Sequence, residues 1–290
     1  MSKTIELKSA PSVPSYYLRA LTARKSGQPP AEERELGRVV LKGRRVDAKS
    51  LSAYRKLCGF PAGDSLPVTY PFVLAAPLHM ELLVSDAFPF RVLGLVHLRN
   101  SITQYRGIGG GELLDIDCSL SGPRPAPKGL EFDLHTRVSI GGELAWECVT
   151  TMLRRGRGSR SAVRVAGKRR KGEFNPVSVT RWHVPADTGR RYARVSGDSN
   201  PIHLSAITAR LFGFRRAIAH GMWTKARSLA QLDSLLPGGP FKVDVFFKLP
   251  ILLPSDVQFQ YCVTEGGRVE FQVKDGAGKK PHLAGTIEPL

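Results

Sequence analysis

One order of secondary-structure patterns occurs twice in this chain, and the repeat constrains the fold more than any other feature. Each copy has a strand, a short helix, an apolar helix and then four strands. The helix patterns cover 47–59 and 68–84 in the first copy, and 186–197 and 222–236 in the second. Period-two alternation in the strands is typical of a sheet with one covered face. A repeat of about 120 residues therefore predicts two similar α+β units in tandem.

This pattern divides the chain into four parts. We expect a loose N-terminal arm over 1–36, a first unit over 37–153, a linker over 154–172 and a second unit over 173–290. Each apolar helix is hydrophobic over a wide arc, so each should be buried against its own sheet. Strand patterns lie at 39–46, 96–103, 113–120, 130–138 and 144–153 in the first copy, and at 177–184, 243–249, 257–263, 269–273 and 283–287 in the second.

The hydrophobic content fits a chain with a buried core and no membrane span. It reaches 42%, yet no apolar run is long enough to cross a bilayer, and the first residues hold no signal-peptide core. The four cysteines show no CxxC spacing, so we expect reduced and mostly buried thiols. These features favour a cytoplasmic location.

The net charge of +18 is concentrated in the predicted linker, where Arg154–Lys171 holds nine basic residues and no acid. A solvated, flexible connection accounts for such a segment. The charge could instead attract an anionic partner, either an acidic carrier protein or the phosphates of coenzyme A. No nucleic-acid-binding motif accompanies the charge, so we expect no nucleic-acid partner.

Polar residues with useful chemistry gather in one stretch of the second copy, Tyr192–Trp223. Asp198 lies in a run of turn-forming residues, and Pro201 fits the first position of a helix that Asn200 would cap. We expect that helix to continue to Gly213. His203 then lies in its first turn, where it and Asp198 could converge on one small molecule such as a water.

Spacing alone leaves other interpretations open. An aspartate before a helix is often a cap, and a histidine near an apolar segment is often structural. A metal site would take His220 as a further ligand, but no HxxxH or paired-cysteine spacing supports one. A nucleophilic Ser196 lacks the GxSxG elbow that would expose it.

The stretch resembles the signature of the MaoC-like dehydratases, the (R)-specific enoyl-thioester hydratase branch of the hot-dog superfamily. The resemblance rests on Ser196-Gly197-Asp198, Asn200-Pro201-Ile202-His203 and Ile218-Ala219-His220-Gly221-Met222, with their spacing intact. It implies a double hot-dog fold, in which each antiparallel sheet wraps around its long apolar helix and the two sheets join. It also implies that Asp198 and His203 form a catalytic dyad, that the Gly221 N–H binds the thioester carbonyl, and that Asn200 and Ser196 support the loop.

The first copy lacks these groups. Aligning Tyr54 with Tyr192 places Phe60 opposite Asp198, and the first copy is about a dozen residues shorter where the second carries His203. The first unit could therefore make room for a long acyl chain, or serve only to complete the sheet and cover its edge.

We expect reversible hydration of trans-2-enoyl thioesters to (3R)-3-hydroxyacyl thioesters. This reaction needs a base, a proton and a donor to the thioester oxygen, but no metal or redox cofactor. Coenzyme A or carrier-protein pantetheine would arrive as part of the substrate. The alternatives are a hot-dog thioesterase and a non-catalytic acyl-thioester-binding subunit, and pairing of two chains into a homodimer stays open. Resemblance and position suggest four substrate contacts: Lys248, Phe60, Tyr70 and Met222.

Overall fold

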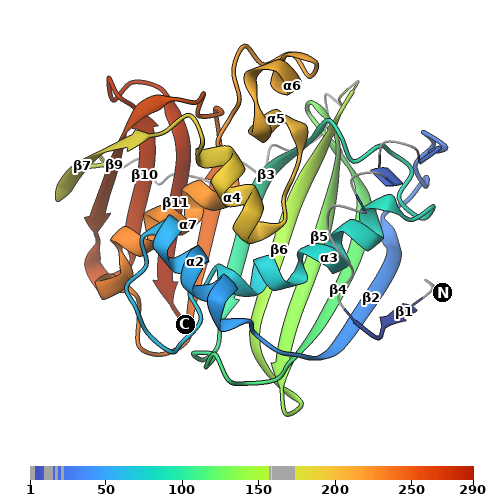
Figure 1. Ribbon diagram of the computed structural model, residues 1–290, viewed down its shortest axis with the longest axis horizontal. Coiled ribbons are helices and arrows are strands. Elements are labelled where there is room, and N and C mark those ends of the chain that lie inside the picture. Colours follow the sequence, from blue (N-terminus) through green and yellow to red (C-terminus); the bar gives the residue numbers. More distant parts are fainter. Residues whose placement is uncertain (1–3, 10–15, 17–18, 21–22, 157, 159–173) are drawn as a thin grey trace.

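The chain folds around one large sheet with helices lying across it. The computed structural model describes residues 4–9, 16, 19–20, 23–156, 158 and 174–290. In these residues the strands form an eleven-stranded sheet in the order β1-β2-β4-β5-β6-β3-β8-β11-β10-β9-β7 (Figure 1). All neighbouring pairs are antiparallel except β1 and β2.

The elements follow the predicted repeat. The first half contains β1 (Thr4–Leu7), β2 (Arg34–Arg44), α2 (Ala48–Cys58), α3 (Tyr70–Val84), β3 (Leu95–Gln104), β4 (Leu114–Ala126), β5 (Gly129–Ile140) and β6 (Glu143–Arg155). The second half contains β7 (Ser178–Val184), α4 (Thr188–Ser196), α5 (Pro201–Leu204), α6 (Ala206–Arg210), α7 (Gly221–Gln231), η1 (Asp233–Leu235), β8 (Phe241–Phe247), β9 (Ser255–Val263), η2 (Glu265–Gly267), β10 (Val269–Asp275) and β11 (Pro281–Pro289).

The strand order shows the internal symmetry directly. From the outside inward, β2-β4-β5-β6-β3 in the first half matches β7-β9-β10-β11-β8 in the second. The halves join where β3 pairs with β8, from Arg99 opposite Phe246 to Gln104 opposite Phe241. We call this β3–β8 pairing the seam. The predicted double hot-dog with one continuous sheet is therefore confirmed.

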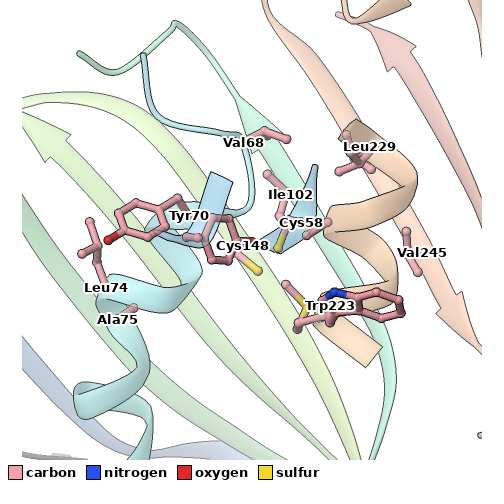
Figure 2. Packing of buried hydrophobic residues seen from close by; sticks show 14 of the residues in the cluster. Cys58, Val68, Tyr70, Leu74, Ala75, Ile102, Cys148, Trp223, Leu229 and Val245 are labelled. Carbon is pink, nitrogen blue, oxygen red and sulfur yellow. The ribbon is translucent and has the colours of Figure 1, made fainter. Parts of the chain in front are cut away.

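Local sequence explains where the helices begin and end. The Asp47 carboxylate caps α2 by accepting from the Ser50 N–H at 2.8 Å, and Gly59 ends that helix at φ 83°. The helix α3 is apolar on nearly all sides, and the first-half sheet wraps around it. Side chains of α3 and α7 meet strand residues such as Ile102 and Val245 in one core across the seam (Figure 2).

Parts of the N-terminal arm that was expected to be loose pack on the first half. Thr4–Leu7 forms β1, which pairs in parallel with β2, and β2 already begins at Arg34. Tyr16 and Ala20 pack against Met80 and Val84 of α3. Burial of these apolar side chains holds the segment to the first half.

The basic linker lies outside the described residues, apart from Arg154–Gly156 and Gly158.

The single helix expected from Pro201 to Gly213 is two short helices. Ser205 between them is extended (φ −154°, ψ 162°), and its side chain caps α6 by accepting a hydrogen bond from the Thr208 N–H. A serine that bonds to nearby backbone competes with helix continuation.

In the described segments, no helix is both long and apolar enough to cross a membrane. None of the four cysteines forms a disulfide in the described part of the chain, and Cys58, Cys118 and Cys148 are buried as expected.

Candidate active site

The loop after α4 holds Asp198 in place through backbone and hydroxyl hydrogen bonds. Gly197 ends α4 at φ 77°, a conformation that suits glycine, and its N–H donates to the Ala193 carbonyl at 2.8 Å. The Ser196 hydroxyl donates to the Tyr192 carbonyl at 2.8 Å and accepts from the Asp198 N–H at 3.2 Å. Ser196 therefore supports the loop, while the Asp198 side chain remains 43% exposed.

Asn200 starts the helix that carries His203. Its side chain accepts from the Ile202 N–H at 3.4 Å, and its own N–H donates to Asp198 Oδ1 at 3.2 Å. Pro201 takes the first helical position, as its fixed φ and missing N–H predict. Asn200 thus links the position of the carboxylate to the start of α5.

The imidazole of His203 is buried, and its environment fixes its tautomer. Nδ1 lies 2.7 Å from the Ile218 carbonyl oxygen, which can only accept, so Nδ1 carries the proton. Burial, with a smaller contribution from His220, lowers the pKa of His203 to about 3, and the nearby Asp198 opposes this. His203 is therefore neutral near pH 7, with an unprotonated Nε2 that can accept a proton.

His220 completes the arrangement in a role that the sequence did not predict. Its Nε2 donates to the Asp198 backbone carbonyl at 3.0 Å and lies 3.8 Å from Asp198 Oδ2. Its ring stacks on His203 with centroids 3.6 Å apart. Burial lowers the pKa of His220, so the stacked pair avoids like charges. Its position in the His-Gly-Met turn was the only sequence signal for it.

The side chains of Asp198, His203 and His220 place one ligand-type atom each within 4.8 Å of one another. This grouping also tests the metal interpretation. The His220 Nε2 must carry a proton to bond a carbonyl, so the lone pair of this ring is on Nδ1, which is buried without a hydrogen-bond partner in the described residues. The edge of His220 nearest Asp198 therefore presents an N–H and not a lone pair, which disfavours a metal ion shared with Asp198.

Gly221 is the first residue of α7, immediately after the cap residue His220. The first N–H groups of a helix have no partner within it and favour negative charge. Space here is limited by Phe247, because a Cβ at Gly221 would lie 2.9 Å from that ring. Phe247 therefore borders the predicted thioester-binding position, although it was not among the predicted site residues.

The first half holds an apolar counterpart of this site. The Tyr54 and Tyr70 rings lie 5.0 Å apart at 55°, and Tyr192 and His220 in the second half lie 4.9 Å apart at 51°. This match supports aligning the apolar helices of the two copies with Tyr70 opposite His220. Phe60, opposite Asp198, is buried and packs near Tyr54 with ring centroids 6.4 Å apart.

The four predicted substrate contacts lie on different elements and differ in burial. Phe60 and Tyr70 are buried in the first half, and Met222 is buried beside Gly221. Lys248 is exposed just after β8, with its ammonium 5.2 Å from the Phe246 ring centroid. Their contact with a substrate stays a prediction.

Lys225 is a buried charged residue that was not among the predicted site residues. It lies on α7 with an exposed fraction of 0%, and its ammonium donates to Asn100 of β3. The signal was its position: Met222, Ala226 and Leu229 define the apolar face of the helix, and residue 225 shares that face by helical spacing.

Comparison with known proteins identifies relatives over most of the chain. Residues 166–286 match the family model described as MaoC like domain. The chain is 36% identical over 245 residues to 3-hydroxyacyl-thioester dehydratase X of Mycobacterium tuberculosis, covering 84% of this chain and 86% of that protein. It is 28% identical over 210 residues to peroxisomal enoyl-CoA hydratase 2 of Arabidopsis thaliana, covering 67% of this chain and 68% of that protein.

A solved structure agrees with these sequence matches. The crystal structure of HtdX of Mycobacterium tuberculosis superposes with a TM-score of 0.74 at 34% identity, over 87% of this chain and all of that one. The likeness therefore extends over both halves of the sheet and beyond the segment that matches the family model.

Proposed function

Since the chain belongs to the MaoC-like dehydratase family, we propose that it interconverts trans-2-enoyl and (3R)-3-hydroxyacyl thioesters through a water held by Asp198 and His203. The chain is a hydro-lyase of acyl-thioester metabolism, as its relatives' names indicate. The observation that carries the residue assignment is the convergence of Asp198, His203 and His220 within 4.8 Å beside the start of α7.

In the hydration direction, the neutral His203 Nε2 takes one proton from the water, while the Asp198 carboxylate accepts a hydrogen bond from the O–H that stays with the water oxygen. The water oxygen forms a bond to C3, and the electron pair of the C2–C3 double bond moves to the thioester oxygen. The Gly221 N–H stabilises that enolate charge at the positive end of α7. The proton then passes from His203 to C2 of the enolate, which restores the neutral imidazole.

The polar groups around the dyad hold its geometry. His220 bonds the Asp198 carbonyl, Asn200 bonds the Asp198 carboxylate, and the Ile218 carbonyl holds the His203 tautomer. These contacts keep the acid and base oriented before substrate binds, so little reorganisation is needed during reaction. No metal or redox group has a role in these steps.

The surface around the site suits an anionic thioester carrier. From Thr188 to Arg216 the only acid is Asp198, and six arginines are exposed: Arg190, Arg191, Arg194, Arg210, Arg215 and Arg216. Such a field would attract the phosphates of coenzyme A or an acidic carrier protein. The choice between these two carriers is left to the substrate assay.

Hydration of crotonyl-CoA and dodecenoyl-CoA tests the proposal, followed by loss of enoyl absorbance and chiral analysis of the product. We expect an (R) product and at least about a hundredfold lower kcat for Asp198→Asn. Asp233→Asn, an exposed acid in η1, serves as the matched control and should retain activity. Activity should also survive dialysis against EDTA.

Several results would count against the proposal. Full activity in Asp198→Asn would rule out the proposed Asp198–His203 dyad. Activity that is lost on EDTA dialysis and restored only by a divalent cation would favour a metal site. Release of free coenzyme A would indicate a thioesterase. An inactive wild type on both CoA substrates and on enoyl carrier protein would favour a non-catalytic binder.

A further inference from the structure

Lys225 is a buried cation that the proposed reaction does not use. Its side chain is 0% exposed, and Nζ donates to Asn100 Oδ1 at 2.6 Å, to the Asn100 carbonyl at 3.1 Å and to the Val243 carbonyl at 3.3 Å. All three acceptors are neutral. In the described part of the chain, no carboxylate accepts a hydrogen bond from this ammonium, so its charge is not neutralised by direct contact.

The acceptors belong to both halves of the molecule. Asn100 is on β3 and Val243 is on β8, so the ammonium bridges the seam. The Asn100 side chain is also fully buried, and its Nδ2 donates to Thr150 Oγ1 at 2.9 Å and to Cys148 Sγ at 3.1 Å on β6. A continuous polar network therefore runs from α7 through β3 to β6.

The repeat provides an internal comparison. Aligning Tyr70 with His220 places Ala75 of α3 opposite Lys225, and Ala75 is also 0% exposed. The first-half helix thus packs on its sheet with a methyl group where α7 carries a buried ammonium. Burying an ion costs several kcal/mol before compensation, so stability alone gives little reason for a lysine here.

We propose that Lys225 is a positioning residue, which fixes the start of α7 against the seam and places an uncompensated positive charge near the site of enolate formation. Gly221 is four residues before Lys225 on the same helix, one turn away. The half without a dyad contributes through Asn100, which holds the ammonium. The catalytic effect of Lys225 rests on the proposed hydratase function. Its role in placing α7 does not depend on that function.

If the positive charge of Lys225 assists the reaction, the rate should depend on the protonation of this side chain. Burial lowers the pKa of Lys225 to about 7, and the nearby Cys148 and Asp244 oppose this shift. Three titratable groups lie close enough to interact electrostatically with the ammonium: Cys148 from β6, Asp244 from β8 and His97 from β3. The charged amine is lost as pH rises, so the assisted rate should fall on the alkaline side.

Kinetics of Lys225→Met test the catalytic consequence, with the exposed α2 lysine substitution Lys56→Met as control. We expect kcat to fall at least about tenfold, with KM within about twofold, because the lost stabilisation acts on the transition state. The alkaline limb of the kcat profile should disappear in Lys225→Met. In Asn100→Asp, a carboxylate beside the ammonium should move that limb up by about one pH unit or more. Lys225→Gln, which keeps polar contacts without the charge, replaces Lys225→Met if that variant does not fold.

Hydrogen exchange of peptides from α7 tests the placement without using the reaction. Exchange over 221–231 should accelerate at least about tenfold in Lys225→Met, while peptides from α3 stay unchanged. Unchanged exchange in α7 overturns the positioning role, whatever the activity of the wild type. Equal rates and pH profiles in Lys225→Met and active wild type would overturn the catalytic role. An inactive wild type with accelerated α7 exchange would instead reject the hydratase function and keep the placement.

Discussion

Replacing Gly189 by alanine should displace His203 without unfolding the chain. Gly189 is buried in α4, where a Cβ would lie 1.9 Å from the His203 carbonyl oxygen and 2.9 Å from its carbonyl carbon. Ordinary contact begins at 3.4 Å. The α4 and α5 backbones must therefore separate by about 1.5 Å, since a backbone carbonyl cannot rotate away as a flexible side chain can.

The free-energy consequences differ for stability and for activity. Overpacking costs about 1–3 kcal/mol, and alanine in a helix returns about 0.5–1 kcal/mol relative to glycine, so the net destabilisation should be about 1–2 kcal/mol. A displacement of about 1 Å in a catalytic group can cost about a hundredfold in rate. We therefore expect about a hundredfold loss of kcat/KM for crotonyl-CoA hydration, equivalent to about 2.7 kcal/mol of activation free energy.

Gly238→Ala is the matched control. A Cβ at Gly238 would meet no heavy atom within 4 Å, so the activity and the unfolding free energy of this variant should stay close to those of wild type. The assay is enoyl absorbance for rate and urea unfolding for stability. Wild-type kcat/KM in Gly189→Ala would refute the close contact between α4 and α5 as the feature that positions His203.

Two further predictions concern acid stability and helix caps. Burial lowers the pKa of His79 to about 4 and of His97 and His203 to about 3, so from pH 6.5 downward the unfolded chain binds protons that the folded chain does not. Stability is therefore complete above pH 6.5 and should fall by about 2 kcal/mol per histidine at pH 5, measured by urea unfolding; a pH-independent unfolding free energy would contradict these burials. Asp47→Ala and Asn200→Ala each remove a cap and should each cost about 1 kcal/mol. Only Asn200→Ala should also lower kcat, because the Asn200 side chain caps α5, the helix that carries His203. Equal kcat values in the two variants would show that the Asn200 side chain does not position the dyad.

Features set by short-range chemistry could be predicted from the sequence. The Asp47 cap, the Gly59 stop and the Pro201 start each depend on a few neighbouring residues, and the structure has all three. The repeat was equally readable, because period-two strands and apolar helices recur in the same order. Asp198 and His203 lie close together because a loop and a first helical turn separate them by only five positions.

Features set by competition or by distant contacts were not predicted. Ser205 breaks the expected helix because its hydroxyl caps α6, and a sequence pattern cannot decide between that bond and helix continuation. The role of His220 depends on a carbonyl 22 positions earlier, and that of Lys225 on Asn100, 125 positions earlier. The pairing of β1 with β2 likewise joins segments that the local pattern treats separately.

The seam has a consequence for how this protein responds to dilution. A pair of separate hot-dog chains exchanges with free subunits, so the integrity of its site depends on protein concentration. Here β3 and β8 belong to one polypeptide, and the tether keeps them at a fixed effective concentration however few molecules are present. Covalent fusion also lets the two copies differ. One copy can keep Phe60 where the other keeps Asp198, an asymmetry that a pair of identical chains cannot have.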